Sequence, residues 1–121
     1  MTDKIVVLVT CETGKQARKI ARTLVEKRLA ACGNWVGVPV HSTYRWRGIV
    51  NTANEHLLIL KSSMDRFEAL EETVKEFHTY LVPEIIAVPI TAGSAEYLLW
   101  MAESIGRRRP PQRRRGEKWG L

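Results

Sequence analysis

Donors for a borderline divalent cation occur near the ends of two predicted strands. His78 and Glu84 lie in the stretch FHTYLVPEII, residues 77–86, where a predicted helix ends and an apolar strand begins. A short connection between the two elements would bring both side chains to one rim of the fold. An imidazole and a carboxylate suit Cu²⁺ or Zn²⁺, especially beside a thiol. Cys11, at the end of another apolar run, is expected to be the accessible thiol, so we expect a metal site built from His78, Glu84 and Cys11.

The same residues also have structural interpretations, which the sequence leaves open. His78 can cap the carboxyl end of the preceding helix, where the helix dipole favours a histidine. Glu84 precedes an apolar strand, so its carboxylate needs a partner, which Lys61, Tyr80 or a bound cation can supply. Cys32 lies between small residues and is interpreted as a core residue, because an unpaired thiol packs like an apolar group.

The chain contains no recognisable catalytic motif. It lacks a phosphate-binding glycine loop, a Cys-x-x-Cys pair, a His-Glu-x-x-His pattern and a serine nucleophile elbow. We therefore expect a protein that is not an enzyme.

Tyr44 and Trp46, near the tip of a predicted hairpin, are aromatic residues of the kind that concentrate in contacts between subunits.

The spacing of apolar residues predicts the elements that position these side chains. Strands are expected at 4–10, 31–47, about 49–63 and 83–90, and helices at 13–29, 63–77 and 94–105. Gly37 and Pro39 interrupt the second strand, which indicates a bulge or a sheet edge, and Arg47–Gly48 is expected to turn the chain into a long hairpin. The order of elements is the split βαβ pattern of the α+β ferredoxin-like fold, βαββαβ, with an added C-terminal helix.

This fold packs two helices on one face of an antiparallel sheet and leaves the other face uncovered. Because apolar residues such as Val6 and Leu8 recur along the strands, an uncovered face would expose more apolar area than monomers normally do. The long hairpin also extends beyond the sheet and needs something to pack against. We therefore expect the subunits to associate.

Charge is unevenly distributed over the 121 residues. Residues 107–121, RRRPPQRRRGEKWGL, hold seven Arg or Lys and one Glu, so the rest of the chain holds 12 basic and 12 acidic residues. We expect one domain at 1–106 and a disordered tail at 107–121, which solubilises the protein or contacts nucleic acid or another polyanion. With two cysteines, no leader pattern and no apolar stretch of about 18 residues, we expect a cytoplasmic protein that does not enter a membrane.

Six blocks of sequence occur together in the order found in one known family. They are VVLVT at 6–10, KRLAACGN at 27–34, STYRWRG at 42–48, LLILKSS at 57–63, HTYLVPEIIAVPI at 78–90 and YLLWMAES at 97–104. From about residue 4 to 104 the chain thus resembles the CutA divalent-cation-tolerance family. The resemblance implies a ferredoxin-like subunit, a homotrimer braced by the long hairpins, a role in tolerance of copper and other divalent metals, and no catalytic reaction.

The resemblance also implies a pocket between adjacent subunits. Here it would draw on Tyr44, Trp46, Lys61, His78, Tyr80 and Glu84, with Cys32 nearby. Our first hypothesis is a homotrimer that binds a divalent cation, Cu²⁺ above all, at this rim. The second is a trimeric sensor, similar to the PII signal-transduction proteins, that holds a small anionic metabolite against Lys61.

Overall fold

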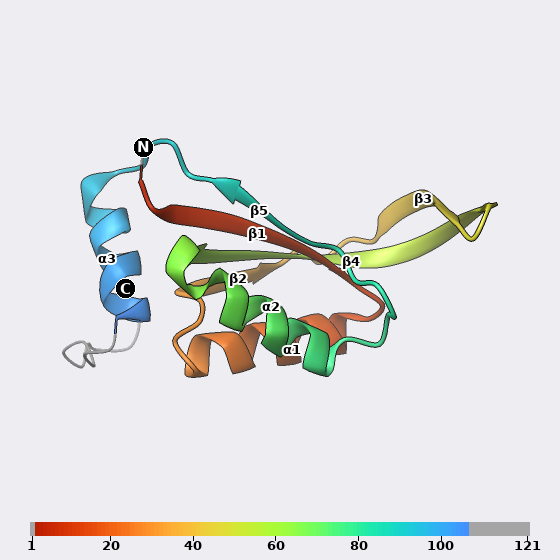
Figure 1. The fold of residues 1–121 in the computed structure, drawn as a ribbon, viewed down its shortest axis with the longest axis horizontal. Helices are drawn as coiled ribbons and strands as arrows, with labels where there is room; N and C mark the ends of the chain where they lie inside the picture. Colours follow the sequence, from red (N-terminus) through yellow and green to blue (C-terminus); the bar gives the residue numbers. More distant parts are fainter. Residues whose placement is uncertain (1, 107–121) are drawn as a thin grey trace.

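The computed structural model describes residues 2–106, and the predicted basic tail at 107–121 lies outside the described residues. In chain order the elements are β1 (Lys4–Cys11), α1 (Gly14–Glu26), β2 (Cys32–Trp35), β3 (Val40–Trp46), β4 (Ile49–Ser63), the short 3₁₀ helix η1 (Met64–Arg66), α2 (Phe67–Phe77), β5 (Ile85–Pro89) and α3 (Ala95–Ile105) (Figure 1). Within residues 2–106, no helix is both long and apolar enough to cross a membrane.

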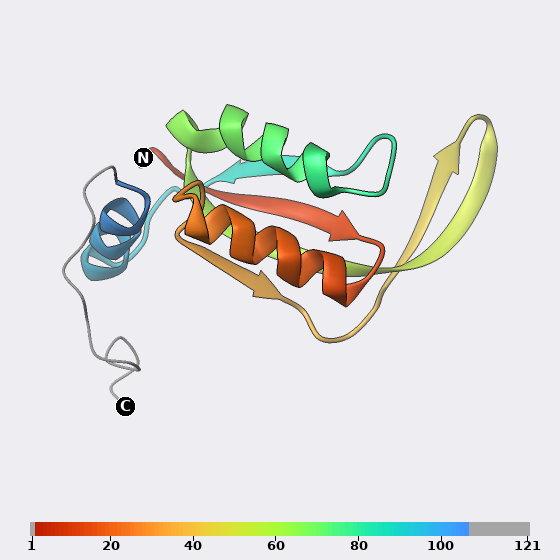
Figure 2. The same ribbon diagram turned by 90° about the horizontal axis from the view of Figure 1, so that it is seen from below.

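The long strand β4 organises the sheet. Its second half lies between β1 and β2, and its first half pairs with β3, so the strand order is β2-β4-β1-β5 with β3 attached to β4. Each of these pairings is antiparallel. Figure 2 shows α1 and α2 side by side across one face of the sheet, and α3 beyond one end. The arrangement confirms the predicted ferredoxin-like fold with its long hairpin and terminal helix.

The predicted strand at 31–47 is two strands, β2 and β3. Residues 36–39 separate them. Pro39 has no N–H to donate to a neighbouring strand, and Gly37 weakens a strand because it has no side chain to pack. The expectation of one strand at 31–47 is therefore wrong, but the expected edge position is confirmed, because β2 and β3 each pair only with β4. The break lets β3 leave the sheet together with the first half of β4. At the tip, Arg47 (φ 51°) and Gly48 (φ 80°) are both left-handed, as a tight two-residue hairpin turn requires.

The core lies between the sheet and the two covering helices. Along β1 every second residue is buried, and Val7 and Val9 are fully shielded. They pack with Ile20 and Leu24 of α1 and with Leu58 of β4. Burial of such a side chain contributes roughly 1.5–3 kcal/mol, so this layer supplies most of the drive for folding.

The other face of the sheet carries apolar side chains that the described chain leaves accessible. Ile86 is 49% exposed and Val88 is 46% exposed on β5. Both are paired in register with β1 residues, Leu8 and Val6, that point away from the buried Val7 and Val9. At the end of the hairpin, Ile49 and Val50 are also exposed.

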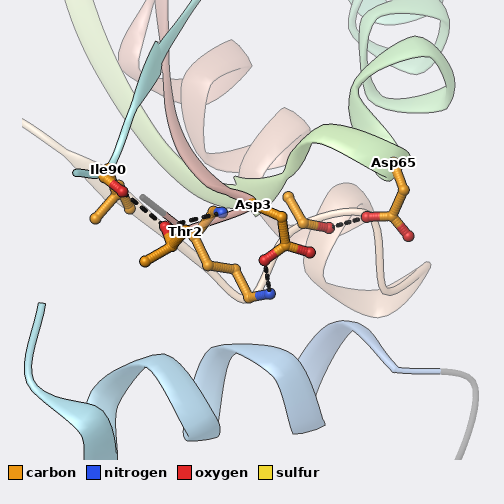
Figure 3. Close-up of polar contacts among 6 residues, drawn as sticks. Thr2, Asp3, Asp65 and Ile90 are labelled. Atoms are coloured by element: carbon orange, nitrogen blue, oxygen red, sulfur yellow. Dashed lines mark hydrogen bonds and ion pairs between the residues drawn. The ribbon is translucent and has the colours of Figure 1, made fainter. Parts of the chain in front are cut away.

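Polar contacts fix the ends of β1 and α3. The Thr2 hydroxyl donates to the Ile90 carbonyl at 2.6 Å and accepts from the Lys4 backbone N–H at 3.1 Å, which joins the start of β1 to the chain after β5 (Figure 3). Arg28 and Arg66 donate to the carbonyls of Ser104 (3.1 Å) and Ile105 (2.8 Å). These two guanidinium groups satisfy carbonyls that the last turn of α3 leaves unpaired.

Candidate functional site

A cleft of about 750 Å³ lies between the hairpin and the loop that joins α2 to β5. β3 and the turn that follows it form one wall, and the loop at 79–84 forms the other. Its lining consists of Thr10, Ser42, Thr43, Tyr44, Trp46, Arg47, Glu55, Thr79, Tyr80, Leu81, Val82 and Glu84. The fold therefore brings together four of the predicted site residues, Tyr44, Trp46, Tyr80 and Glu84.

The cleft also contains a buried carboxylate that the sequence did not single out. Glu55 is only 8% exposed, and the Tyr80 hydroxyl forms a hydrogen bond with it. Burial, and next this bond to Glu55, raise the pKa of Tyr80, so the phenol stays protonated and acts as the donor. Among residues 2–106, no Lys, Arg or His forms an ion pair with Glu55.

His78 lies behind the cleft wall and has both ring nitrogens occupied. The Tyr80 backbone N–H donates to Nδ1 at 3.0 Å, so the ring proton is on Nε2, which donates to the Thr10 carbonyl at 2.8 Å. The ring also packs on Tyr80, with centroids 4.8 Å apart. His78 occupies the C-cap position of α2, as its structural interpretation expects, but its ring contacts β1 and the loop instead of the end of the helix. A metal ion at either nitrogen would replace one of these bonds.

Cys11 does not have the predicted accessibility. It is fully buried in the core under the helices, because the alternation along β1 places it on the same face as Val7 and Val9. Burial, and next the charge of Glu55, raise the pKa of the Cys11 thiol to about 11. A buried protonated thiol is a poor metal ligand, so the expectation of an accessible Cys11 donor at the rim is wrong.

Lys61 and Cys32 lie outside the cleft of the single chain. Cys32 on β2 pairs with Lys61 on β4, and Lys61 also pairs with Val6 on β1. Glu84 lies further along β1, because it precedes Ile85, which pairs with Val9. The Lys61 ammonium donates to the Asn34 side-chain carbonyl, and Cys32 forms a hydrogen bond with Tyr97. Cys32 is partly exposed, so it is not the core residue of our interpretation. The suggested pair of Lys61 with Glu84 is also absent among residues 2–106.

A side-chain network holds the loop wall of the cleft in place. Thr79 donates to a carboxylate oxygen of Glu12 at 3.2 Å and accepts from Gln16 Nε2 at 3.2 Å. Gln16 Oε1 also accepts from the Glu12 backbone N–H at 3.1 Å, and the Thr13 hydroxyl caps α1 by accepting from the Gln16 N–H. The helix start predicted at residue 13 is therefore confirmed, with Thr13 as its N-cap, and Gln16 also reaches the loop.

The charge of the cleft favours cations over anions. Two carboxylates, Glu55 and Glu84, line it, against one guanidinium, Arg47. The Arg47 guanidinium lies 5.6 Å from the centre of the Trp46 ring, so an aromatic wall already contacts a cation. Within residues 2–106, no group of three or more His, Cys, Asp or Glu side chains is placed to hold a metal ion.

The CutA1 divalent ion tolerance protein family model matches residues 5–104. The divalent-cation tolerance protein CutA of Thermus thermophilus is 48% identical over 101 residues, which cover 84% of this chain and 97% of that protein. Its solved structure has a TM-score of 0.82, covering 85% of this chain and 99% of that one. CutA of Xylella fastidiosa has a TM-score of 0.83 at 35% identity, covering 87% and 100%. A periplasmic divalent cation tolerance protein, CutA of Archaeoglobus fulgidus, has a TM-score of 0.82 at 34% identity, covering 85% and 99%. The chain belongs to the CutA1 divalent ion tolerance family.

Proposed function

We propose that this member of the divalent ion tolerance family is a non-catalytic, cytoplasmic homotrimer that binds a divalent cation, with Cu²⁺ as the first candidate, in the cleft between the hairpin and the loop at 79–84. The observation that carries the proposal is Glu55. The Glu55 side chain is only 8% exposed and lines the cleft, and no Lys, Arg or His of residues 2–106 forms an ion pair with it. A bound cation supplies the missing charge.

In this proposal Glu55 and Glu84 provide the carboxylate oxygens. Glu84 keeps the role expected of it, and Glu55 replaces the buried Cys11. Water molecules or a second copy of the chain complete the coordination shell. His78 takes part only if one of its two ring contacts is released, so in the resting cleft it positions Tyr80.

The proposed homotrimer rests on the uncovered sheet face and on the hairpin. Ile86 and Val88 on the face, with Ile49 and Val50 on the hairpin, are large apolar residues that association would bury. Association would also explain how Lys61 and Cys32 reach the pocket that the family resemblance implies, since a neighbouring subunit would contribute them. A cytoplasmic setting is consistent with two cysteines that do not form a disulfide.

Calorimetric titration of Cu²⁺, and separately of Zn²⁺, into the full chain tests the proposal. We expect one saturable site per subunit, and Glu55→Gln should weaken the affinity at least about tenfold, as loss of a charged ligand does. Glu72→Gln, which removes a carboxylate from the exposed surface of α2, is the matched control and should leave the affinity unchanged. Equal affinity of Glu55→Gln and the wild-type chain would refute the site.

A further inference from the structure

The two helices that cover the sheet carry opposite charge. Residues 14–28, which form α1 and the turn after it, include six Arg or Lys and one Glu, whereas α2 includes four Glu and one Lys. The single acid of the first segment, Glu26, is already paired with Arg22 at 3.2 Å. The equal numbers of basic and acidic residues outside the tail therefore conceal a positive helix that lies beside a negative one (Figure 2).

The positive charges of α1 form one continuous surface. Lys15, Arg18, Lys19 and Arg22 recur at intervals of three and four, so they share one side of the helix, and all four are exposed. We call them the α1 basic face. At 1.5 Å per residue the face is about 10 Å long, which matches two to three phosphates of an extended strand. The first turn of α1 contains no acidic residue, so the positive end of the helix dipole adds to the field there.

An exposed aromatic ring borders the α1 basic face. Trp35, at the end of β2, is 38% exposed, and the Arg18 guanidinium lies 5.5 Å from its ring centre. The indole N–H donates to His56 Nδ1 at 3.1 Å, which fixes the orientation of the ring. Gly14 permits this position, because a Cβ at residue 14 would overlap the Trp35 ring. The indole is therefore held against the start of α1 with part of its surface open.

We propose that the α1 basic face and Trp35 bind single-stranded nucleic acid. Phosphates would contact the Lys and Arg side chains while a base stacks on the exposed part of Trp35, the combination by which proteins bind single strands without reading sequence. The acidic α2 repels a polyanion from one side and so directs the strand along the border between α1 and β2. This surface is separate from the cation cleft and does not depend on it.

A membrane surface fits the same charges less well. Binding in a bilayer interface needs an apolar face that enters the acyl region. Within α1, which the structure describes completely, Val25 is the exposed large apolar residue, and it is only 40% exposed. A fixed indole with basic side chains next to it suits a base and its phosphates instead.

The proposal is tested with the full chain, by fluorescence anisotropy of a short labelled oligouridine at several salt concentrations. Lys15→Gln/Lys19→Gln should lower the affinity and make the plot of log affinity against log salt shallower by about 1.4, since each lost phosphate contact removes about 0.7. Arg45→Gln/Arg47→Gln removes the same charge from the exposed hairpin and should leave both quantities unchanged. Trp35→Leu should weaken binding at least about fivefold through loss of stacking.

Three results would overturn the proposal. If the wild-type chain does not bind the oligouridine, the α1 basic face is not a nucleic-acid site. If both double variants lower the affinity equally, the attraction comes from net charge or from the basic tail. Retention of affinity by Trp35→Leu, with equally tight binding of a duplex, excludes the single-strand mode. Circular dichroism and light scattering of each variant separate loss of binding from loss of fold.

Discussion

The phenol of Tyr80 and the carboxylate of Glu55 form a hydrogen bond inside the cleft, and Glu55 is almost completely buried. Tyr80 comes from the loop after α2 and Glu55 from β4, so the bond ties the loop wall to the sheet. His78 supports the same arrangement, because its ring binds both the Tyr80 backbone N–H and the Thr10 carbonyl. Contacts within the chain thus organise the cleft.

Removal of the Tyr80 hydroxyl should destabilise the fold. In Tyr80→Phe the Glu55 carboxylate stays buried but loses its donor, and an unsatisfied buried acceptor costs about 1–3 kcal/mol. Urea denaturation should therefore show a lower free energy of unfolding for this variant. Tyr44→Phe, at a residue that is 45% exposed, is the control and should unfold like the wild-type chain. Equal stability of all three proteins would argue against the Tyr80–Glu55 bond.

Stability should fall as the pH rises from about 9 to about 11. Burial raises the pKa of Cys11 from its ordinary value of 9.0 to about 11, so in this window the folded chain holds a proton that the unfolded chain releases. This contribution to the free energy of unfolding, about 1–3 kcal/mol, is fully present below pH 9 and is lost between pH 9 and pH 11. The raised pKa of Tyr80 acts in the same direction at slightly higher pH.

Urea denaturation at several pH values checks this expectation. Cys11→Ala should be less stable than the wild-type chain at neutral pH, because it leaves a cavity, but should lose less stability between pH 9 and 11. Cys32→Ala is the matched control, and its free energy of unfolding should fall with pH as steeply as that of the wild-type chain. If the free energy of unfolding of Cys11→Ala fell as steeply between pH 9 and 11 as that of the wild-type chain, the buried thiol would not titrate in this window.

A charge on the uncovered sheet face should dissociate the proposed trimer. Val88→Asp places a carboxylate where association would bury an apolar side chain, and an unpaired buried charge costs several kcal/mol. Light scattering should report three subunits for the wild-type chain and one for Val88→Asp. The same substitution at Val25, an exposed valine on α1, should leave the mass unchanged. Trimers of Val88→Asp would show that this face does not form the contact.

Much of the fold is predictable from sequence because its periodicities are strong. The alternation of apolar residues in β1 and their helical spacing in α1 arise because these two elements bury their apolar faces against each other. Arg47–Gly48 predicts the hairpin turn through backbone preference alone. The division of 31–47 into two strands is harder to predict. It depends on which half of β4 each segment pairs with, and a propensity pattern does not contain that information.

The candidate site is less predictable, because its members come from distant segments. Tyr44, Trp46, Tyr80 and Glu84 share the cleft, but Lys61 and Cys32 lie elsewhere in the single chain. Cys11 ends its strand but points into the core, because the alternation that buries Val7 and Val9 continues to residue 11. Glu55 was missed, and the available signal was an acidic residue at the start of the apolar run HLLIL.

The most direct test of the cation cleft is an anomalous difference map from crystals of the full chain soaked in Cu²⁺. The account predicts a peak between the hairpin and the loop at 79–84, within coordination distance of Glu55 and Glu84 oxygens, with His78 still bound to Thr10. A peak at His41 or His56 with an empty cleft would contradict it.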